Sequence, residues 1–287
     1  MESIPATAIL LVSCVDQSGL VSAISSFISD AHGNIVDLEQ HVDSAQKAFF
    51  MRVEWQLEGF NIAAQQIAGA LEPLLTRFDM QWSLHFSDVR PQVALFVTRD
   101  NHCLYDLLSR HQSGDLLMDI PLIISNRSDL EPVARQFNIP FHHIPITAEN
   151  KAVQEKKQIA LLTKHHIDTI VLARYMQILS ADFVDHFPNQ IINIHHSFLP
   201  AFPGARPYHS AHQRGVKIIG ATSHYVTSDL DEGPIITQDV IRVSHRETVS
   251  DFIRKGKDLE KIVLSRAVWR HLQHRILVYK NRSVVFA

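Results

Sequence analysis

VALFVTRDNHCLYDLLSRHQSGDLLMDIPLIIS, residues 93–125, is the stretch from which the architecture of most of this chain can be derived. Apolar runs at 93–98 and 120–125 have the length and composition of buried strands, and a helix-length segment at 103–111 lies between them. The same alternation continues with segments at 130–137, 141–146, 153–165 and 169–173. Strands that alternate with helices predict an α/β domain with a doubly wound, mainly parallel sheet, which binds its ligands beyond the carboxyl ends of the strands.

The residues before this stretch follow a different order. The apolar and helical patterns there predict a strand, a helix, two strands, a helix and a strand at 8–14, 20–31, 34–42, 48–56, 61–77 and 80–86. This is the order of a ferredoxin-like βαββαβ sheet. We therefore predict two domains, 1–88 and 89–287, and the second ends in a long helix at 248–274 and a hairpin at 278–286.

The composition of the 287 residues is that of an ordinary globular protein, with 46% hydrophobic and 20% charged residues. A net charge of −3 without a basic stripe argues against a nucleic-acid partner. No basic segment precedes the first apolar run, and no apolar run reaches eighteen residues, so we expect neither export nor a membrane anchor. Because Cys14 and Cys103 are the only cysteines, a disulfide framework is excluded and a cytoplasmic location is favoured.

Polar side chains follow two strands in the least generic stretch, NQIINIHHSFLPAFPGARPYHSAHQRGVKIIGATSHYVTSDLDEGPII (189–236). Asn193 and His195 are two residues apart on an extended chain, so their side chains point to the same side. Asp231 lies in a turn-forming run after the next strand, and such a turn can bring a carboxylate back toward them. An amide donor, an imidazole and a carboxylate suit attack on a carbonyl group, because the amide stabilises the developing oxyanion.

Spacing alone leaves a plainer interpretation equally open, in which these side chains only hydrogen-bond a loop or form a turn. A covalent mechanism is disfavoured because Ser197 lacks the GxSxG context of a nucleophilic serine. The histidine pairs at 142–143, 165–166 and 195–196 form no motif with metal-ligand spacing. Cys103, at the start of a predicted helix, is more simply a packed side chain than a reactive thiol. We therefore expect neither a metal nor a cofactor.

The same stretch resembles the folate-dependent formyltransferase family, whose pattern is Asn-x-His-x-Ser-x-Leu-Pro-x-x-x-Gly followed by Leu-Asp-x-Gly-Pro. The pattern falls here on Asn193, His195, Ser197, Leu199, Pro200 and Gly204, and then on Leu230, Asp231, Gly233 and Pro234. The resemblance implies a Rossmann-like formyltransferase domain with Asn193, His195 and Asp231 as catalytic residues. The folate-binding residues that it implies are Met176, Gln177, Ile178, Leu179, His224, Val226 and Ser228.

The acceptor of the formyl group is indicated by the loop after the first strand of this domain. Family members that formylate a phosphorylated amine hold its phosphate there in a glycine-rich loop, whereas this chain has TRDNHC (98–103). Without glycines the backbone does not readily form an anion-binding nest, so we expect water as the acceptor. The implied reaction is hydrolysis of 10-formyltetrahydrofolate to formate and tetrahydrofolate, which supplies formate for purine synthesis and balances the folate pools. The alternatives are transfer of the formyl group to an amine, and a folate or amino-acid sensor without catalysis.

The N-terminal domain resembles an ACT domain through DQSGL (16–20), at its first strand-to-helix turn, and GNI (33–35), before its second strand. Because ACT domains commonly pair across subunits and bind small effectors, the resemblance implies a homo-oligomer, a dimer or a tetramer, with methionine or glycine as effector. The implied effector-binding residues are Asp16, Gly19, Leu20, Asn34 and Ile35. The simpler alternative is a domain that only mediates oligomerisation.

Overall fold

The computed structural model describes residues 5–201 and 207–287, so Gly204 of the formyltransferase pattern lies outside the described residues. The chain separates into two compact units. The first unit contains the chain up to Arg90 together with Gln273–Leu277 and Val284–Ala287, and the second contains Pro91–Leu272 and Val278–Ser283. The first unit thus includes C-terminal residues that a single boundary near Asp88 leaves with the second.

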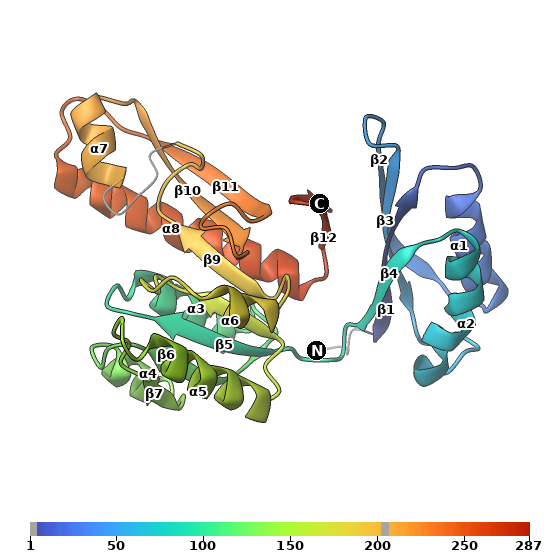
Figure 1. Cartoon of the computed structure of the whole chain (residues 1–287). Helices are drawn as coiled ribbons and strands as arrows, with labels where there is room; N and C mark the ends of the chain where they lie inside the picture. The colour runs from blue at the N-terminus through green and yellow to red at the C-terminus, as the bar shows by residue number, and fades with distance from the viewer. Residues whose placement is uncertain (1–4, 202–206) are drawn as a thin grey trace. The chain divides into compact units, whose positions relative to one another are not determined.

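The first unit has the predicted βαββαβ order, which confirms the ferredoxin-like fold (Figure 1). Its elements are β1 (Thr7–Val15), α1 (Leu20–Asp30), β2 (Ile35–Asp43), β3 (Ala48–Gln56), α2 (Ala64–Arg77) and β4 (Gln81–Phe86). The four strands form one sheet in the order β2-β3-β1-β4, and each adjacent pair is antiparallel. The two middle strands, β1 and β3, are the most apolar, because they are covered on both sides by neighbouring strands.

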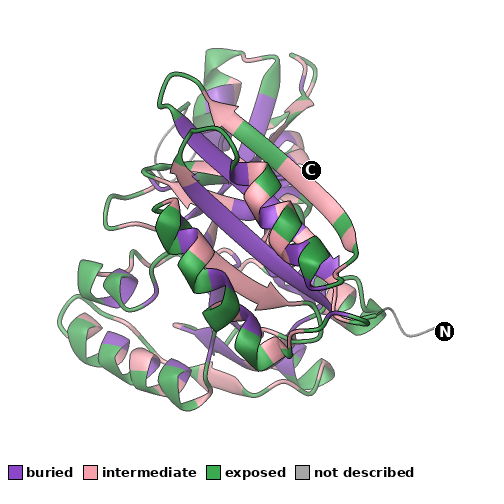
Figure 2. Ribbon diagram, turned by 90° about the vertical axis from the view of Figure 1, so that its right-hand side faces the viewer, coloured by how far each residue is buried: buried purple, intermediate pink, exposed green. Residues whose placement is uncertain are grey.

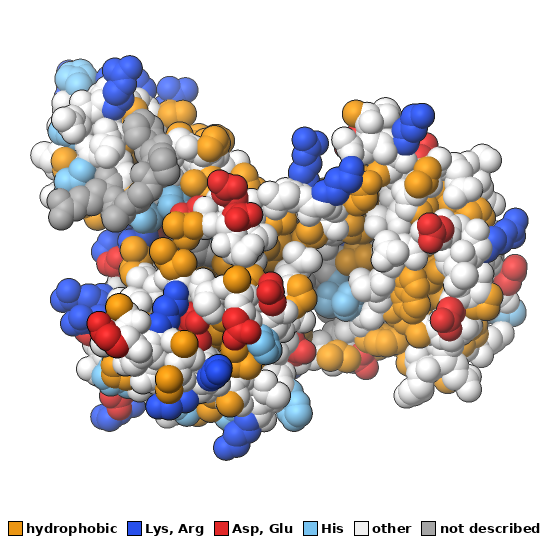
Figure 3. Space-filling view, in the orientation of Figure 1, with side chains coloured by type: hydrophobic (Ala, Val, Ile, Leu, Met, Phe, Trp, Pro, Cys, Tyr) orange, Lys and Arg blue, Asp and Glu red, His pale blue; other side chains and the backbone are white. Residues whose placement is uncertain are grey.

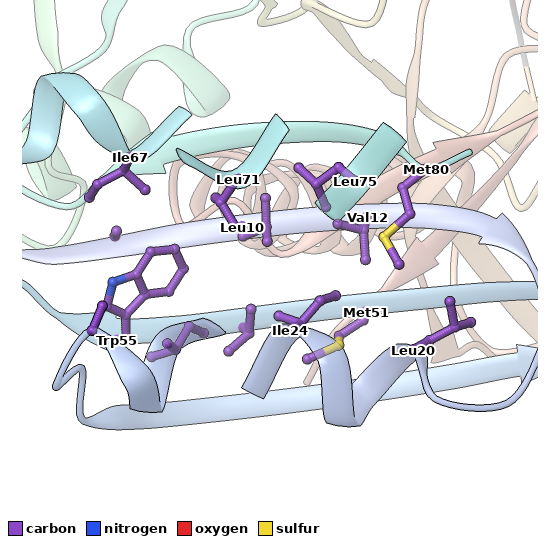
Figure 4. Packing of buried hydrophobic residues seen from close by; sticks show 14 of the residues in the cluster. Leu10, Val12, Leu20, Ile24, Met51, Trp55, Ile67, Leu71, Leu75 and Met80 are labelled. Atoms are coloured by element: carbon purple, nitrogen blue, oxygen red, sulfur yellow. The ribbon is translucent and has the colours of Figure 1, made fainter. Parts of the chain in front are cut away.

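The core of this unit lies between the sheet and its two helices (Figure 4). Helix α1 contributes side chains at a four-residue spacing, which form one apolar stripe along its length. The same spacing recurs in α2, and alternate residues of β1 and β3 complete the cluster. Its fully buried members include Leu10, Val12, Ile24, Ile28, Met51, Trp55, Ile67, Leu71 and Leu75.

The opposite face of this sheet holds a buried arginine. Arg52 is 1% exposed and forms ion pairs with Asp37 at 2.8 Å and with Glu54 at 2.7 Å. Its Nε also donates to the carbonyl oxygen of His274 at 3.1 Å, and Arg275 pairs with the same Asp37 at 3.2 Å. A buried guanidinium needs this many acceptors to offset its desolvation. These bonds attach the C-terminal residues to the first unit.

The second unit has the predicted alternation of strands and helices, and its sheet order is β11-β10-β9-β8-β5-β6-β7. Its elements are β5 (Gln92–Val97), α3 (His102–Ser113), β6 (Asp119–Ser125), α4 (Glu131–Gln136), β7 (Phe141–His143), α5 (Lys151–Lys164), β8 (Thr169–Leu172), α6 (Ala181–Asp185), β9 (Ile191–His195), α7 (Pro207–Arg214), β10 (Ile218–Tyr225), β11 (Ile235–Arg242) and α8 (Val249–Leu272). The strands from β5 to β9 are parallel, whereas β10 runs antiparallel to both β9 and β11. This confirms the mainly parallel sheet. A separate two-stranded sheet is formed by β12 (Ile276–Tyr279) and β13 (Arg282–Val285).

The central strands of this sheet are buried on both faces. Ala94 and Phe96 of β5 pack in a cluster with Leu162 of α5 and Phe183 of α6, while the residues between them on the other face are equally buried. The helices in Figure 2 alternate between buried and exposed residues, as expected for elements with one face on a sheet. Strand β11, which was not predicted from the sequence, lies at the sheet edge and is only partly buried.

The outer surface carries Lys, Arg, Asp and Glu side chains in a mixed pattern on the face shown in Figure 3. This distribution fits the small net charge of −3. In the described ranges, 5–201 and 207–287, no helix combines the length and the apolar character that crossing a membrane requires.

Candidate active site

The site begins at the carboxyl end of β9, where Asn193 and His195 face one cavity, as their two-residue spacing predicts. Antiparallel pairing with β10 places His224 directly opposite Asn193. Asn193 Nδ2 lies 3.2 Å from His224 Nε2, and His224 Nδ1 lies 2.8 Å from the carbonyl oxygen of Tyr225. That carbonyl requires a proton on Nδ1, so in the neutral ring Nε2 accepts one N–H of the amide. The second N–H of Asn193 is then available to a ligand.

The carboxylate of Asp231 completes the set. It lies 3.2 Å from His195 Nδ1 and 3.5 Å from His224 Nε2. The backbone of Asp231 has a φ of 57°, a left-handed conformation that Asp and Asn adopt more readily than most residues. Hydrogen bonding to His195 is the largest effect that lowers the pKa of Asp231 far below its usual range. The carboxylate is therefore charged at any pH near neutrality.

The imidazole of His195 is oriented by this carboxylate. The residue is 6% exposed, its Nδ1 faces Asp231, and its Nε2 has no hydrogen-bond partner within the described part of the chain. Because a proton on Nδ1 is favoured by the carboxylate, the neutral ring presents Nε2 as an acceptor. A buried acceptor without a protein partner next to a cavity is suited to take a proton from a bound molecule.

Because the pKa of Asp231 is low in the folded chain, we expect the contribution of this residue to stability to depend on pH. A carboxylate whose pKa is lower in the folded chain stabilises the fold above its unfolded pKa of about 3.9, and this contribution is lost as the pH falls below that value. We expect Asp231→Asn to unfold at a lower temperature than the wild type at about pH 7, and the difference in Tm to shrink below about pH 4. Thermal melts across this range check the expectation, and a Tm difference independent of pH would contradict it.

Gly233 allows the loop of Asp231 to approach β10. A Cβ atom at this position would lie 1.8 Å from the carbonyl oxygen of Tyr225, a backbone atom that cannot move aside alone. The same close approach lets the Tyr225 N–H donate to the carbonyl oxygen of Pro234 at 2.9 Å. The close approach to Tyr225 therefore explains why the Leu-Asp-x-Gly-Pro pattern has glycine at position 233.

We expect Gly233→Ala to lower kcat by about 100-fold, since the loop must shift by about 1 Å or more and carries the carboxylate with it. Steady-state kinetics and a thermal melt measure the two effects. Gly69→Ala is the matched control, because Gly69 lies in α2 with open space around it and should gain about 0.5 kcal/mol or more in stability at unchanged kcat. Wild-type kinetics for Gly233→Ala would refute the steric account.

The cavity around these residues has a volume of about 810 Å³, which suits a ligand larger than an amino acid. Met176 and Ile178 are 50% and 61% exposed, an unusual exposure for large apolar side chains. Exposed apolar side chains in the wall of a cavity favour a flat, partly apolar ring. All the predicted substrate-binding residues line this cavity, namely Met176, Gln177, Ile178, Leu179, His224, Val226 and Ser228.

Arg174 and Asn281 are among the residues of this cavity wall that were not singled out from the sequence. Arg174 lies two residues after the end of β8 and has a left-handed backbone with a φ of 64°. A charged residue just after an apolar strand was the only local signal for it. Asn281 donates from Nδ2 to the carbonyl oxygen of Glu232 at 2.8 Å, a contact across 49 residues that leaves no pattern in the sequence.

The predicted effector-binding residues fall into two groups in the first unit. Asp16, Gly19 and Leu20 lie at the start of α1, and Asn34 and Ile35 lie beyond its end. Eleven residues of helix span about 16 Å, so within one chain a small effector contacts only one of the groups. Leu20 is also 2% exposed and belongs to the core.

One side-chain group in the described residues has the spacing of metal ligands, namely His102, Cys103 and Glu260. Its atoms are already engaged, because His102 Nε2 lies 2.8 Å from Glu260 Oε2 and Tyr208 donates to Glu260 Oε1. Arg174 Nε lies 3.5 Å from the same carboxylate, and this positive charge disfavours a cation. Burial, and then the charge of Glu260, raises the pKa of the Cys103 thiol well above its usual value. This donor set suits a hydrogen-bonded ion cluster better than a metal.

Each of the two units matches a known protein family. Residues 91–268 match the Formyl transferase family and residues 8–75 match the ACT domain family. A Formyltetrahydrofolate deformylase from Synechocystis sp. is 59% identical over 281 residues, which cover 98% of this chain and 99% of that protein. The crystal structure of a formyltetrahydrofolate deformylase from Pseudomonas syringae pv. tomato is 42% identical, with a TM-score of 0.97 over 100% of this chain and 96% of that one.

A structure of glycinamide ribonucleotide transformylase 1 from Symbiobacterium toebii is 28% identical with a TM-score of 0.65, and it covers 71% of this chain and 98% of that one. The fold and the site thus define a formyl transferase domain that follows an ACT domain. Over nearly its whole length, the chain belongs to the formyltetrahydrofolate deformylase family.

Proposed function

We propose that this chain hydrolyses 10-formyltetrahydrofolate to formate and tetrahydrofolate. The observation that carries the proposal is the set of Asn193, His195 and Asp231 on one cavity, with the buried Nε2 of His195 unpartnered in the described residues. Membership of the formyltetrahydrofolate deformylase family supports the choice of substrate. The exposed apolar side chains of Met176 and Ile178 fit the pterin-like ring of a folate.

On this geometry we propose a role for each of the three residues. The free N–H of Asn193 donates to the carbonyl oxygen of the formyl group and stabilises the negative charge that develops there. A water molecule attacks the formyl carbon and gives its proton to Nε2 of His195, and Asp231 stabilises the resulting imidazolium. His195 then returns the proton to the leaving nitrogen of tetrahydrofolate, and formate is released. The mechanism calls on no metal or cofactor.

The proposal also covers the cellular location, the regulation and the oligomeric state of the chain. The two cysteines, Cys14 and Cys103, are free, and burial raises the pKa of the Cys103 thiol. Both observations fit a reducing cytoplasm, where formate is used in purine synthesis. The ACT unit supports regulation by an amino acid, with methionine or glycine as the effectors to test, in a homo-oligomer of two or four chains.

Incubation of the purified protein with 10-formyltetrahydrofolate in the absence of any amine tests the proposal. We expect steady release of formate and tetrahydrofolate in equal amounts over many turnovers. A protein that binds folate but releases formate only when an amine is added would be a transferase, and one that binds folate without any turnover would be a sensor. Either result overturns the proposal.

A further inference from the structure

A cluster of charged side chains that the mechanism does not use lies beside the catalytic residues in the second unit. It surrounds Arg174, whose side chain is 12% exposed and lines the same cavity as Asn193 and His195. We call it the Arg174 cluster, and its members are Arg174, Asp100, Glu260, Lys257, His102 and Tyr208. It joins the loops after β5 and β8 to helices α3, α7 and α8.

The contacts within the Arg174 cluster hold the guanidinium in place. Arg174 donates to Asp100 Oδ2 at 3.1 Å, and its Nε lies 3.5 Å from Glu260 Oε2. Lys257 donates to the other oxygen of Asp100 at 3.0 Å, while His102 and Tyr208 occupy Glu260, which is 1% exposed. Both carboxylates are thus already paired with positive charges or hydrogen-bond donors. Neither is available to a cationic amine.

The backbone of Arg174 has a left-handed φ of 64°, which costs an L-residue with a long side chain some free energy. Glycine adopts this conformation without that cost. An arginine at such a position is explained if its side chain has a task. The cluster and the cavity wall together indicate what that task is.

The position of Arg174 relative to the catalytic residues follows from the sheet order β10-β9-β8-β5. His224 and the loop of Asp231 come from β10, on one side of Asn193 and His195. Arg174 and Asp100 follow β8 and β5, on the other side. Asp100 lies in the loop 98–103, where the sequence contains no anion-binding nest, and it places a negative charge where a phosphorylated acceptor would need a positive one.

We propose that Arg174, anchored by Asp100 and Glu260, is a specificity-determining residue that fills the acceptor side of the cavity and thereby admits water but excludes primary amines. The inference rests on the proposed hydrolysis and explains its acceptor. A guanidinium there removes the space for an amine's substituent, and by pairing with Asp100 and Glu260 it leaves neither carboxylate to bind an amine. Water needs neither the space nor a carboxylate partner.

Hydrolysis and transfer to an amine both conserve atoms and protons. With water, the C–O bond of formate forms, the bond from the formyl carbon to the folate nitrogen breaks, and that nitrogen gains a proton. With an amine, a C–N bond forms instead, the amine loses a proton and the folate nitrogen gains one. The products are then tetrahydrofolate and an N-formyl amine. His195 and Asp231 serve the proton transfers of either route.

The test uses the full chain, 10-formyltetrahydrofolate and glycinamide as the acceptor, and it measures formate and N-formylglycinamide by mass spectrometry. Arg174→Gly opens the space and suits the left-handed backbone. The wild type should yield formate alone at every glycinamide concentration. In Arg174→Gly, the ratio of N-formylglycinamide to formate should rise about 10-fold or more above the wild-type background. This ratio does not depend on the amount of folded enzyme.

Arg174→Lys keeps a cation beside Glu260 and Asp100 and serves if Arg174→Gly does not fold. It should give a smaller but measurable share of N-formylglycinamide, because the lysine ammonium fills less of the cavity wall. If both folded variants release formate alone, or bind folate without forming either product, the inference is overturned. If the wild type itself releases no formate, the proposed hydrolysis has failed, and this result is distinct from the others.

Discussion

Asp231→Asn should lower kcat about 1,000-fold or more while folate binding stays within about threefold of the wild type. The amide occupies the same volume and adopts the left-handed backbone of this position, so the loop is preserved. What is lost is the negative charge next to His195 Nδ1. Without it, the proton on Nδ1 and the imidazolium formed during water attack are no longer stabilised. Single-turnover rates and a folate titration measure the two quantities.

The control for this variant is Asp239→Asn, which removes a carboxylate of similar exposure on β11 that pairs with Arg266 at 2.9 Å. Its kcat should stay unchanged, because exposed ion pairs contribute little and this one lies outside the cavity lining. If Asp231→Asn keeps wild-type turnover, the carboxylate is not catalytic. If that variant loses both turnover and folate binding together with its fold, Asp231 is a structural residue.

Asn193→Leu should lower kcat about 100- to 1,000-fold with a small effect on KM. Leucine has nearly the shape of asparagine but no N–H, so the formyl oxygen loses its donor in the transition state. The variant also removes the donor to His224 Nε2, at 3.2 Å. Steady-state kinetics with 10-formyltetrahydrofolate check the prediction.

A second variant separates these two effects of the asparagine. His224→Gln leaves Asn193 in place and keeps an acceptor near it, so kcat should fall by about 10-fold at most if His224 only orients the amide. A fall as large as that of Asn193→Leu would assign His224 a direct part in the chemistry. Wild-type kcat in Asn193→Leu would remove the amide from the mechanism.

Local patterns were sufficient to predict most of the elements and to place Asn193 and His195 on the same side of one strand. Residues two apart in any strand point to the same side. This applies to Asn193 and His195 because their strand is held in place by Ile191 and Ile192, which are fully buried. The βαββαβ order of the first unit could be read for the same reason, since its turns and apolar runs are local. The return of Asp231 toward β9 depended on a turn that the Asp-x-Gly-Pro run encodes.

Contacts between residues far apart in the chain could not be predicted in this way. Arg52 and His274 are 222 positions apart, and no pattern near either residue indicates the other. Strand β11 is an edge strand with partial burial, so its alternation of apolar residues is weak. The role of Arg174 depends on Asp100 and Glu260, which come from the loop after β5 and from helix α8.

The predicted effector residues show the same limit in the first unit. The resemblance implied effector-binding residues in both DQSGL and GNI, and α1 separates the two segments along its length within one chain. Buried Leu20 contributes to the core, and the Asn34 amide donates to Gln56 at 2.9 Å. A site that uses both groups would need a second chain, which a single sequence does not describe.

The most direct test of the central claim is hydrolysis of 10-formyltetrahydrofolate in water enriched in ¹⁸O, without any amine. If water attacks the formyl carbon, the formate released must carry one oxygen from the solvent and one from the formyl group. Mass spectrometry of the formate after a single turnover distinguishes this from other routes. We expect formate with a single ¹⁸O atom from the wild type and none above background from Asp231→Asn. Formate without ¹⁸O, or no formate at all from a folded wild-type protein that binds folate, would contradict the proposed function.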